Sequence, residues 1–335
     1  MARPRLVVLA PDALFRSFFD EPRQRRLRRS YRWTRSGDRA FSRRLRAELA
    51  EADGLVTTWD SPRFGEELLR LAPRLRIIGH CGGEVKARFA RPLFRRLTIT
   101  NAPGPMAAYV AELAVTLLLH AARNVDAHRD ALRRSNAVYS RIHRDGVGEE
   151  TILGCTVGLL GLGQIGRSIA ALLRPFGVRL LVHDPYVSRA AVRKAGGTPG
   201  SWREALTSSR YLVLAAALTA ETRGLLDRAS LRLLPDGATV INVARGGLVD
   251  LRALTEEVRR GRLRCALDVT DPDEPLPPRH PLRRLRGAVL TPHVGAAQRE
   301  VRARMADTVL DDLGRFFDGR RVKNRVTTGM LDRMT

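Results

Sequence analysis

The sequence is short of cysteine, lysine, aromatic residues and long apolar runs, and each shortage excludes something. Three well-separated cysteines, Cys81, Cys155 and Cys265, provide neither a disulfide framework nor a zinc site, so a reducing cytoplasm is expected. The first apolar run is broken by Pro11 and Asp12, which indicates a strand and turn rather than a secretory signal. No apolar run approaches the roughly 18 to 20 residues that span a bilayer, so no membrane segment is expected.

The scarcity of lysine shapes the charge of the chain. Only three of the 59 basic residues are lysines, and arginines are scattered through every segment, giving a formal net charge of +24. Such dispersion is typical of a coding bias rather than of a binding patch. The densest stretch, residues 21–50, holds eleven arginines and three acids. It could attract nucleic acid by counterion release, but we favour one or two solvated helix faces and expect no nucleic-acid partner.

Length and pattern predict two α/β domains. A chain of 335 residues with 44% hydrophobic residues exceeds what one core usually serves. The first third alternates short apolar runs with helical segments, including the arginine-rich stretch, and one long helix is expected over 107–133. A second series of apolar runs begins at Leu153, and their near-continuous character is typical of parallel strands covered on both faces. The last segment, 300–322, is expected to be an amphipathic helix that returns to the first domain.

A glycine motif predicts the cofactor site. The stretch "GLGQIG" places Gly161, Gly163 and Gly166 between an apolar strand and a helix. The first glycine allows a tight turn, the second lets the backbone approach a pyrophosphate, and the third lets helix and strand pack closely. Unpaired N–H groups at the helix start, where Gln164 and Ile165 lie, would then face the phosphates.

An acid ends the next strand of this series. Asp184 can accept hydrogen bonds from the adenosine ribose hydroxyls and would repel a 2′-phosphate. NAD is therefore favoured over NADP as the cofactor. Arg189 lies close by in the sequence and keeps NADP open as the alternative.

Polar residues follow three further strands. Ala244 and Arg245 follow "TVINV", Asp268 follows "RCAL" and opens an acidic stretch, and His293 follows "AVLTP". Because the carboxyl ends of parallel strands meet at one edge, these groups are expected to gather beside the cofactor. An arginine, carboxylates and a histidine are the groups needed there to move a hydride and a proton.

Four ordered motifs, "GLLGLGQIGR", "INVARGGLVD", "ALDVTDPDEPLP" and "LTPHVGAA", resemble the D-isomer-specific 2-hydroxyacid dehydrogenase family. The likeness continues in "LRIIGHCGGEVK" and "ITNAPGPMAAYVAEL" and covers most of the chain from about Leu55. It implies two doubly wound parallel-sheet domains. A Rossmann NAD-binding domain, 103–295, would be inserted into a flavodoxin-like substrate domain, 1–102 and 296–335. It also implies a homodimer formed through the region of the long helix.

The resemblance implies a role for each polar group. Arg245 would bind the carboxylate and carbonyl of a small 2-oxo acid, and His293 would be the general acid or base. Asp268 would face the nicotinamide side of the cofactor, and Ala244 would also contact it. The resemblance leaves two candidates for the carboxylate that partners His293, because one residue is inserted relative to the family pattern. Position by count indicates Asp273, whereas the following Pro-Leu context favours Glu274, which we prefer.

The resemblance also extends to a substrate loop. Gly82 and Gly83 would offer backbone N–H groups to the substrate carboxylate, the alternative being a plain strand-to-helix turn. Asn101 is expected to be a hinge or substrate-side residue. The sequence departs from the family at Ala215 and Ala217, where members commonly carry histidine and proline.

Two other functions compete with the dehydrogenase. One is an NAD-sensing, corepressor-like regulator on the same fold, with the arginine-rich stretch serving partners. The other is phosphite or formate dehydrogenase chemistry, which also uses arginine and histidine. The joint presence of Arg245, His293 and a nearby carboxylate favours the 2-hydroxyacid enzyme.

Overall fold

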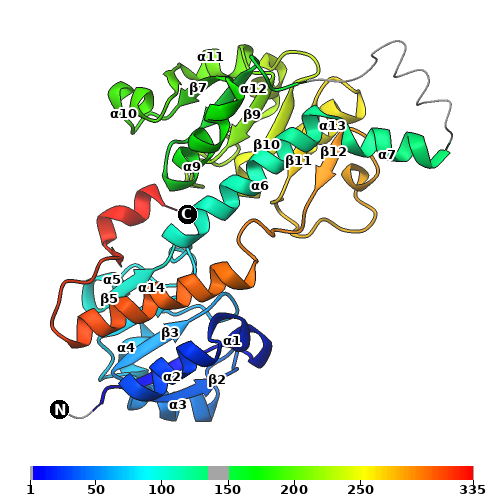
Figure 1. Ribbon diagram of the computed structural model, residues 1–335. Helices are drawn as coiled ribbons and strands as arrows, with labels where there is room; N and C mark the ends of the chain where they lie inside the picture. The colour runs from blue at the N-terminus through cyan, green and yellow to red at the C-terminus, as the bar shows by residue number, and fades with distance from the viewer. Residues whose placement is uncertain (1–2, 135–150, 335) are drawn as a thin grey trace. The chain divides into compact units, whose positions relative to one another are not determined.

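The computed structural model describes residues 3–134 and 151–334, and the chain divides into two compact units. The first unit comprises Met1–Met106 and Ala296–Thr335, and the second comprises Ala107–Gly295. The resemblance had placed the division after residues 102 and 295. Each unit has its own sheet and its own hydrophobic core (Figure 1).

The sheet of the first unit has the order β13-β5-β4-β3-β1-β2, in which only the edge strand β13 is antiparallel. Its strands are β1 (Arg5–Leu9), β2 (Arg32–Ser36), β3 (Gly54–Thr57), β4 (Ile77–His80), β5 (Thr98–Asn101) and β13 (Arg325–Val326). The helices are α1 (Asp12–Phe18), α2 (Glu21–Ser30), α3 (Arg43–Ala50), α4 (Glu67–Leu71), α5 (Leu93–Arg96) and α14 (Arg299–Phe317). The parallel order 2-1-3-4-5 is that of flavodoxin-like sheets, as predicted.

The last long helix does return to the first unit. Figure 1 shows α14 running across the sheet of that unit, where it packs on β4, α1 and α2. A Cβ atom on Gly79 of β4 would lie 2.4 Å from Cγ1 of Val309, so the helix and the strand are in close contact.

The arginine-rich stretch is not wholly helical, contrary to the expectation for residues 21–50. It contains β2, which pairs in parallel with β1 along its full length. The sequence of β2, "RWTRS", combines strand-favouring Trp33 and Thr34 with an alternation of exposed and partly buried positions. Arginine masks this alternation, because its long apolar stem lets it occupy half-buried positions as readily as exposed ones.

The sheet of the second unit has the order β12-β11-β10-β9-β6-β7-β8 and is parallel throughout. Its strands are β6 (Thr156–Leu160), β7 (Arg179–His183), β8 (Thr198–Pro199), β9 (Tyr211–Leu214), β10 (Thr239–Asn242), β11 (Arg264–Leu267) and β12 (Ala288–Leu290). The helices after β6 are α9 (Gln164–Leu173), α10 (Arg189–Lys194), α11 (Trp202–Thr207), α12 (Arg228–Leu233) and α13 (Leu251–Arg259). The predicted doubly wound sheet is confirmed, although the two-residue β8 was not foreseen. The strand order reverses between β6 and β9, which is where ligands bind in such sheets.

The long helix expected over 107–133 is two helices, α6 (Gly104–Ala122) and α7 (Val125–Arg134). The chain turns between them at Asn124, whose φ of 50° is left-handed. Asparagine adopts this conformation more readily than most residues, so the break has a local cause. The polar stretch predicted after α7 lies outside the described residues, apart from Thr151.

By length and composition alone, α6 is apolar enough to cross a membrane, although Glu112 and His120 interrupt its apolar residues. Half of its apolar window is buried inside the protein. A core helix passes the same test, and the buried residues recur at helical spacing along α6, including Val110, Ala114 and Leu118.

Candidate active site

The glycine motif connects β6 to α9 as predicted. Gly161 has φ +93°, and a Cβ atom there would lie 2.7 Å from the Ala216 backbone. A Cβ atom on Gly166 would lie 2.2 Å from the Gly161 carbonyl oxygen, so helix and loop touch at that point. In contrast, a Cβ atom on Gly163 would meet nothing within 4 Å. The first and third glycines are therefore needed by the fold itself, whereas Gly163 leaves open space at the start of α9, where Gln164 and Ile165 lie.

Asp184 follows β7 and faces the same loop. Its Oδ2 accepts a hydrogen bond from the Leu162 backbone N–H at 2.7 Å, and its Oδ1 accepts one from the Tyr186 N–H at 2.9 Å. The carboxylate is thus fixed against the glycine motif. Each of its oxygens still has a lone pair for a ribose hydroxyl, because a carboxylate can accept about four hydrogen bonds.

Arg245 lies in a sharply turned segment after β10. The side-chain amide of Asn242 closes this turn by donating to the Arg245 carbonyl at 2.9 Å and accepting from the Ala244 N–H at 3.0 Å. A Cβ atom on Gly246 would lie 2.1 Å from the Thr270 carbonyl carbon. The segment that carries Arg245 therefore lies directly against the segment that follows β11.

The acidic stretch after β11 reaches the histidine that follows β12. Nδ1 of His293 lies 2.9 Å from Oε1 of Glu274, and the two side chains are 49% and 37% exposed. The other acids differ in placement: Asp271 pairs with Arg223 at 3.5 Å, and the Asp273 carbonyl accepts from the Thr270 hydroxyl. Of the two acids proposed as the histidine's partner, the structure brings Glu274 to the imidazole.

Asp268, at the end of β11, is only 2% exposed. Its Oδ1 accepts hydrogen bonds from the Thr291 hydroxyl at 2.6 Å and the Val294 N–H at 2.9 Å, and its Oδ2 accepts from the Gly295 N–H at 3.0 Å. The segment that carries His293 is thus tied to Asp268. The sequence showed that Asp268 ends a strand but not that the next strand's loop would take up its carboxylate.

In the first unit, the predicted substrate-loop residues lie together. Asn101 donates from its side-chain amide to the Gly83 carbonyl at 2.7 Å, and the Ala102 N–H donates to the Gly82 carbonyl at 2.8 Å. The Gly82 N–H itself donates to the His80 carbonyl at 2.9 Å, so this donor is already used within the turn. Of the two glycines expected to offer N–H groups to the substrate, Gly82 therefore has its N–H engaged within the turn.

Two aromatic side chains, His80 and Trp59, lie close to Gly82 in this loop. A Cβ atom on Gly82 would lie 2.5 Å from Nε2 of His80 and 3.0 Å from Nε1 of Trp59. His80 is 1% exposed and shares a 2.9 Å hydrogen bond with the Thr57 hydroxyl. Burial, together with the nearby charge of Arg88, lowers the pKa of His80 to about 3. The imidazole is consequently neutral at physiological pH and acts as packing rather than as an acid.

The same unit has a cavity of about 370 Å³ beside this loop. Its lining includes Trp59, Arg63, Glu84 and Arg88. The Arg88 guanidinium donates to the Trp59 carbonyl at 2.8 Å and to the Ser61 carbonyl, which joins the substrate loop to the segment after β3.

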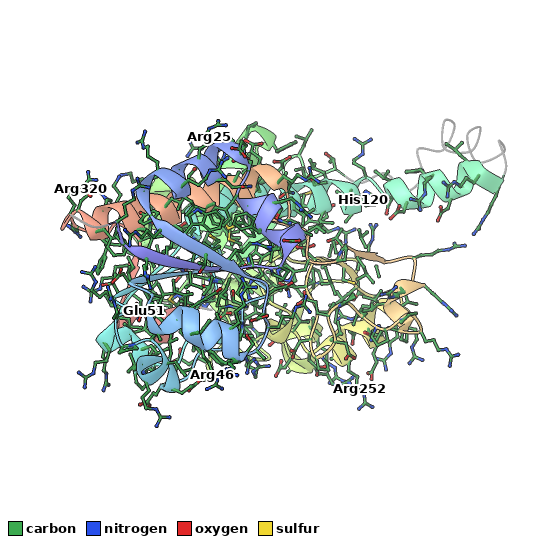
Figure 2. The ribbon with its side chains drawn as sticks, turned by 90° about the horizontal axis from the view of Figure 1, so that it is seen from below. Arg25, Arg46, Glu51, His120, Arg252 and Arg320 are labelled. Atoms are coloured by element: carbon green, nitrogen blue, oxygen red, sulfur yellow. The ribbon has the colours of Figure 1, made fainter. Side chains whose placement is uncertain are left out.

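The arginine-rich stretch is largely neutralised by acids of the first unit. Seven of its eleven arginines form ion pairs, such as Arg23 with Asp307 and Arg26 with Asp311, both at 2.6 Å or less. Figure 2 shows Arg25 and Arg46 at separate parts of the surface rather than in one patch. This arrangement supports solvated, paired helix faces.

Comparisons with known proteins agree with the geometry. Residues 115–295 match the model of the D-isomer specific 2-hydroxyacid dehydrogenase NAD binding domain. The chain is 33% identical to the glyoxylate reductase of Aeropyrum pernix over 84% of its own length and 85% of that protein. The chain belongs to the D-isomer specific 2-hydroxyacid dehydrogenase family.

Other relatives differ in length, and one solved structure is of a protein named as NADPH-dependent. The chain is 35% identical to the D-3-phosphoglycerate dehydrogenase of Mycobacterium leprae over 88% of its own length but 54% of that protein, so it spans about half of the phosphoglycerate dehydrogenases that it matches. It also resembles the solved NADPH-dependent glyoxylate/hydroxypyruvate reductase of Sinorhizobium meliloti. The TM-score is 0.78 and the identity 26%, over 97% of this chain and 98% of that one.

In this family member, the sequence analysis did not predict two residues that contact the predicted site residues. Thr291 lies in the motif "LTPHVGAA" and donates to the Asp268 carboxylate, and Trp59 lies against Gly82, yet the sequence analysis gave neither of them a role. A usable signal for Thr291 was its place between a strand end and His293. The signal for Trp59 was a large aromatic residue directly after a buried strand, at the edge where ligands bind.

Proposed function

We propose that this family member is an NAD-dependent oxidoreductase that interconverts a small 2-oxo acid and its 2-hydroxy acid. The observation that carries the proposal is the 2.9 Å contact between His293 and Glu274, formed in the unit that holds the glycine motif. Arg245 follows β10, which is separated from β12 in the sheet by β11 alone. The segment that carries Arg245 touches the segment that follows β11. A bound nicotinamide supplies the hydride.

The side chains have separate tasks in the proposed reaction. The Arg245 guanidinium binds the substrate carboxylate with two parallel hydrogen bonds and so orients the carbonyl. Since Nδ1 of His293 faces Glu274, Nε2 is the atom that gives a proton to the carbonyl oxygen during reduction and takes it back during oxidation. Glu274 fixes the orientation of the imidazole through this contact.

In the first unit, the substrate loop is the proposed binding element. We assign the carboxylate donor to the Gly83 N–H, with Gly82 shaping the turn and Asn101 holding it through the Gly83 carbonyl. Backbone donors suit a small acid, because they recognise the carboxylate without demanding a particular side chain on the substrate.

We propose that NAD is preferred to NADP. Gly161, Gly163 and Gly166, with the first turn of α9, would bind the pyrophosphate, and the open space at Gly163 fits a backbone approach. The Asp184 carboxylate beside this loop would accept from the ribose hydroxyls and repel a 2′-phosphate. Ala244, which is buried at the end of β10, would contribute cofactor contact.

We further propose a cytoplasmic homodimer. All three cysteines are free thiols, which agrees with a reducing compartment. On α7, Val125 and Leu132 are 47% and 55% exposed, and residues seven apart share a helix face. If that face joins two copies, Leu132→Asp should shift the mass measured by light scattering from dimer to monomer.

The experiment that tests the function is a turnover assay. Purified protein is given NADH or NADPH with a panel of 2-oxo acids, including glyoxylate, hydroxypyruvate, pyruvate and aromatic members. We expect turnover of at least one, faster with NADH, and a loss of about 100-fold or more in His293→Ala. Binding of NADH without turnover of any member would contradict the proposal, as would full activity of the variant.

A further inference from the structure

His293 has an unusual backbone conformation. Its φ is +54°, in the left-handed region, and it shares this feature with Asn124 among non-glycine residues of the described chain. Histidine adopts this conformation more often than most non-glycine residues but still seldom, so contacts with the surroundings are needed to stabilise it. A left-handed residue points its side chain differently from an extended one, so whatever holds the backbone also aims the imidazole.

Most of the described hydrogen bonds that hold this segment end on one residue, Asp268, with a further one from the Thr291 N–H to the Leu267 carbonyl at 3.0 Å. Four donors in the segment 291–295 converge on Asp268: the His293 N–H donates to its carbonyl at 2.9 Å, and the Thr291 hydroxyl, Val294 N–H and Gly295 N–H donate to its carboxylate. The donors lie on both sides of His293 in the chain. The left-handed residue is thus gripped before and after its own Cα atom.

The burial of the carboxylate makes this grip strong. Asp268 is 2% exposed, and a buried carboxylate must have its oxygens hydrogen-bonded. Its partners are the hydroxyl and the two N–H groups of this one segment, and charge-assisted hydrogen bonds of this kind are stronger than neutral ones. Releasing the segment would leave the carboxylate without these partners, so the loop and the carboxylate stabilise each other.

We propose that Asp268 is a positioning residue, which sets the left-handed turn at His293 and thereby aims the imidazole at the substrate oxygen. The inference rests on the proposed function for its effect on rate. It is compatible with a contact between Asp268 and the nicotinamide, since Oδ1 accepts two hydrogen bonds from the loop and Oδ2 accepts one, which leaves one acceptor site on Oδ2.

The test uses two variants that weaken this grip, the set of hydrogen bonds between the loop and Asp268. One changes the acceptor and the other removes a donor. Asp268→Asn keeps the shape but turns an amide NH₂ toward the loop's donors, and Thr291→Val removes one donor while keeping its volume. We expect kcat to fall about 100-fold in the first, as for a misplaced catalytic group, and about 10-fold in the second. The dissociation constant for NADH, measured by its fluorescence in the absence of substrate, should stay within about 3-fold of wild type in Thr291→Val, which leaves the Asp268 carboxylate in place. Because the variants break the same grip, their double variant should lie close to Asp268→Asn alone.

Asp271→Asn is the matched control, since Asp271 lies in the same acidic stretch but pairs with Arg223 at the surface. Isotope effects separate positioning from a loss of folded protein. If the imidazole is misaimed, the solvent deuterium effect on kcat should rise in both grip variants as proton transfer becomes limiting. A smaller folded fraction would leave that effect unchanged.

Two results would overturn the inference. One is a 10-fold or greater weakening of NADH binding in Asp268→Asn with kcat spared at saturating NADH, which is the signature of a cofactor contact. The other is a crystal structure of either variant in which His293 keeps its positive φ and its contact with Glu274. This structural readout needs no turnover. If the wild-type protein reduces no 2-oxo acid, the proposed function fails while the positioning role is still decided.

Discussion

The contact between His293 and Glu274 gives the sharpest prediction. Glu274→Gln keeps the length and shape of the side chain but replaces a charged acceptor by a neutral amide. The amide oxygen can still accept from Nδ1, so the orientation of the imidazole is partly retained. What is lost is the charge of the acceptor, and a hydrogen bond to a charged group is stronger than one to a neutral group.

The size of the loss follows from exposure. A hydrogen bond to a charged group contributes about 1.5 to 3 kcal/mol when well shielded. Here the two side chains are 49% and 37% exposed, so solvent screens the pair and the lower end of that range applies. A loss of about 1.4 kcal/mol corresponds to a tenfold lower rate. We therefore expect kcat/KM for reduction to fall about 10-fold, far less than in His293→Ala.

The assay is initial-rate reduction of the best 2-oxo acid at saturating NADH and neutral pH. Asp273→Asn is the matched control, because Asp273 is the exposed neighbour that the sequence alone offered as the partner. That variant should stay within about 2-fold of wild type. Equal losses in both variants, or an unchanged rate in Glu274→Gln, would refute the assignment of the carboxylate.

Three further predictions concern the loops. Gly163→Ala should weaken NADH binding about 10-fold or more in a fluorescence titration and leave Tm unchanged. The added Cβ atom meets no protein atom within 4 Å, yet it would stand where the backbone approaches the pyrophosphate. A lower Tm with intact NADH binding would contradict this prediction. Gly82→Ala should lower the free energy of unfolding by about 1 to 3 kcal/mol in urea, since its Cβ atom would overlap buried His80, and an unchanged midpoint would show that the loop can yield. The pKa of His80 is lowered to about 3, below the unfolded value of about 6.5, so protonation favours the unfolded chain. Wild type should thus lose about 2 kcal/mol more stability than His80→Gln between pH 7 and pH 4.5, and parallel pH profiles would disprove it.

Much of the fold could be predicted because buried parallel strands leave a plain apolar pattern. The strands of the second unit from "TVGLL" to "AVL" carry it, apart from the two-residue β8. The pattern failed where arginine filled half-buried positions, as in β2, and where a single residue broke a helix, as at Asn124. Neither the strand β2 nor the break at Asn124 changes the local apolar composition, so the apolar pattern of the sequence does not predict either of them.

The candidate site was predictable in its parts and less so in its pairings. Motif spacing gave the chemistry of Arg245, His293 and the acidic stretch. It left Glu274 and Asp273 open, since an inserted residue shifts the loop by an amount that only its folded path decides. The cofactor role of Asp268 stays a prediction, and the sequence could not show that the neighbouring loop turns back and donates to its carboxylate.

The return of α14 to the first unit has a consequence for how the protein is made. All of the second unit, Ala107–Gly295, has been synthesised before the first residue of α14 is added. The first unit begins earlier, yet β4 is left without its covering helix until Arg299–Phe317 emerges from the ribosome. Domains fold as units once their chain is available, so the part that starts first should finish last. Until then, the apolar face of β4 is the surface most in need of a chaperone.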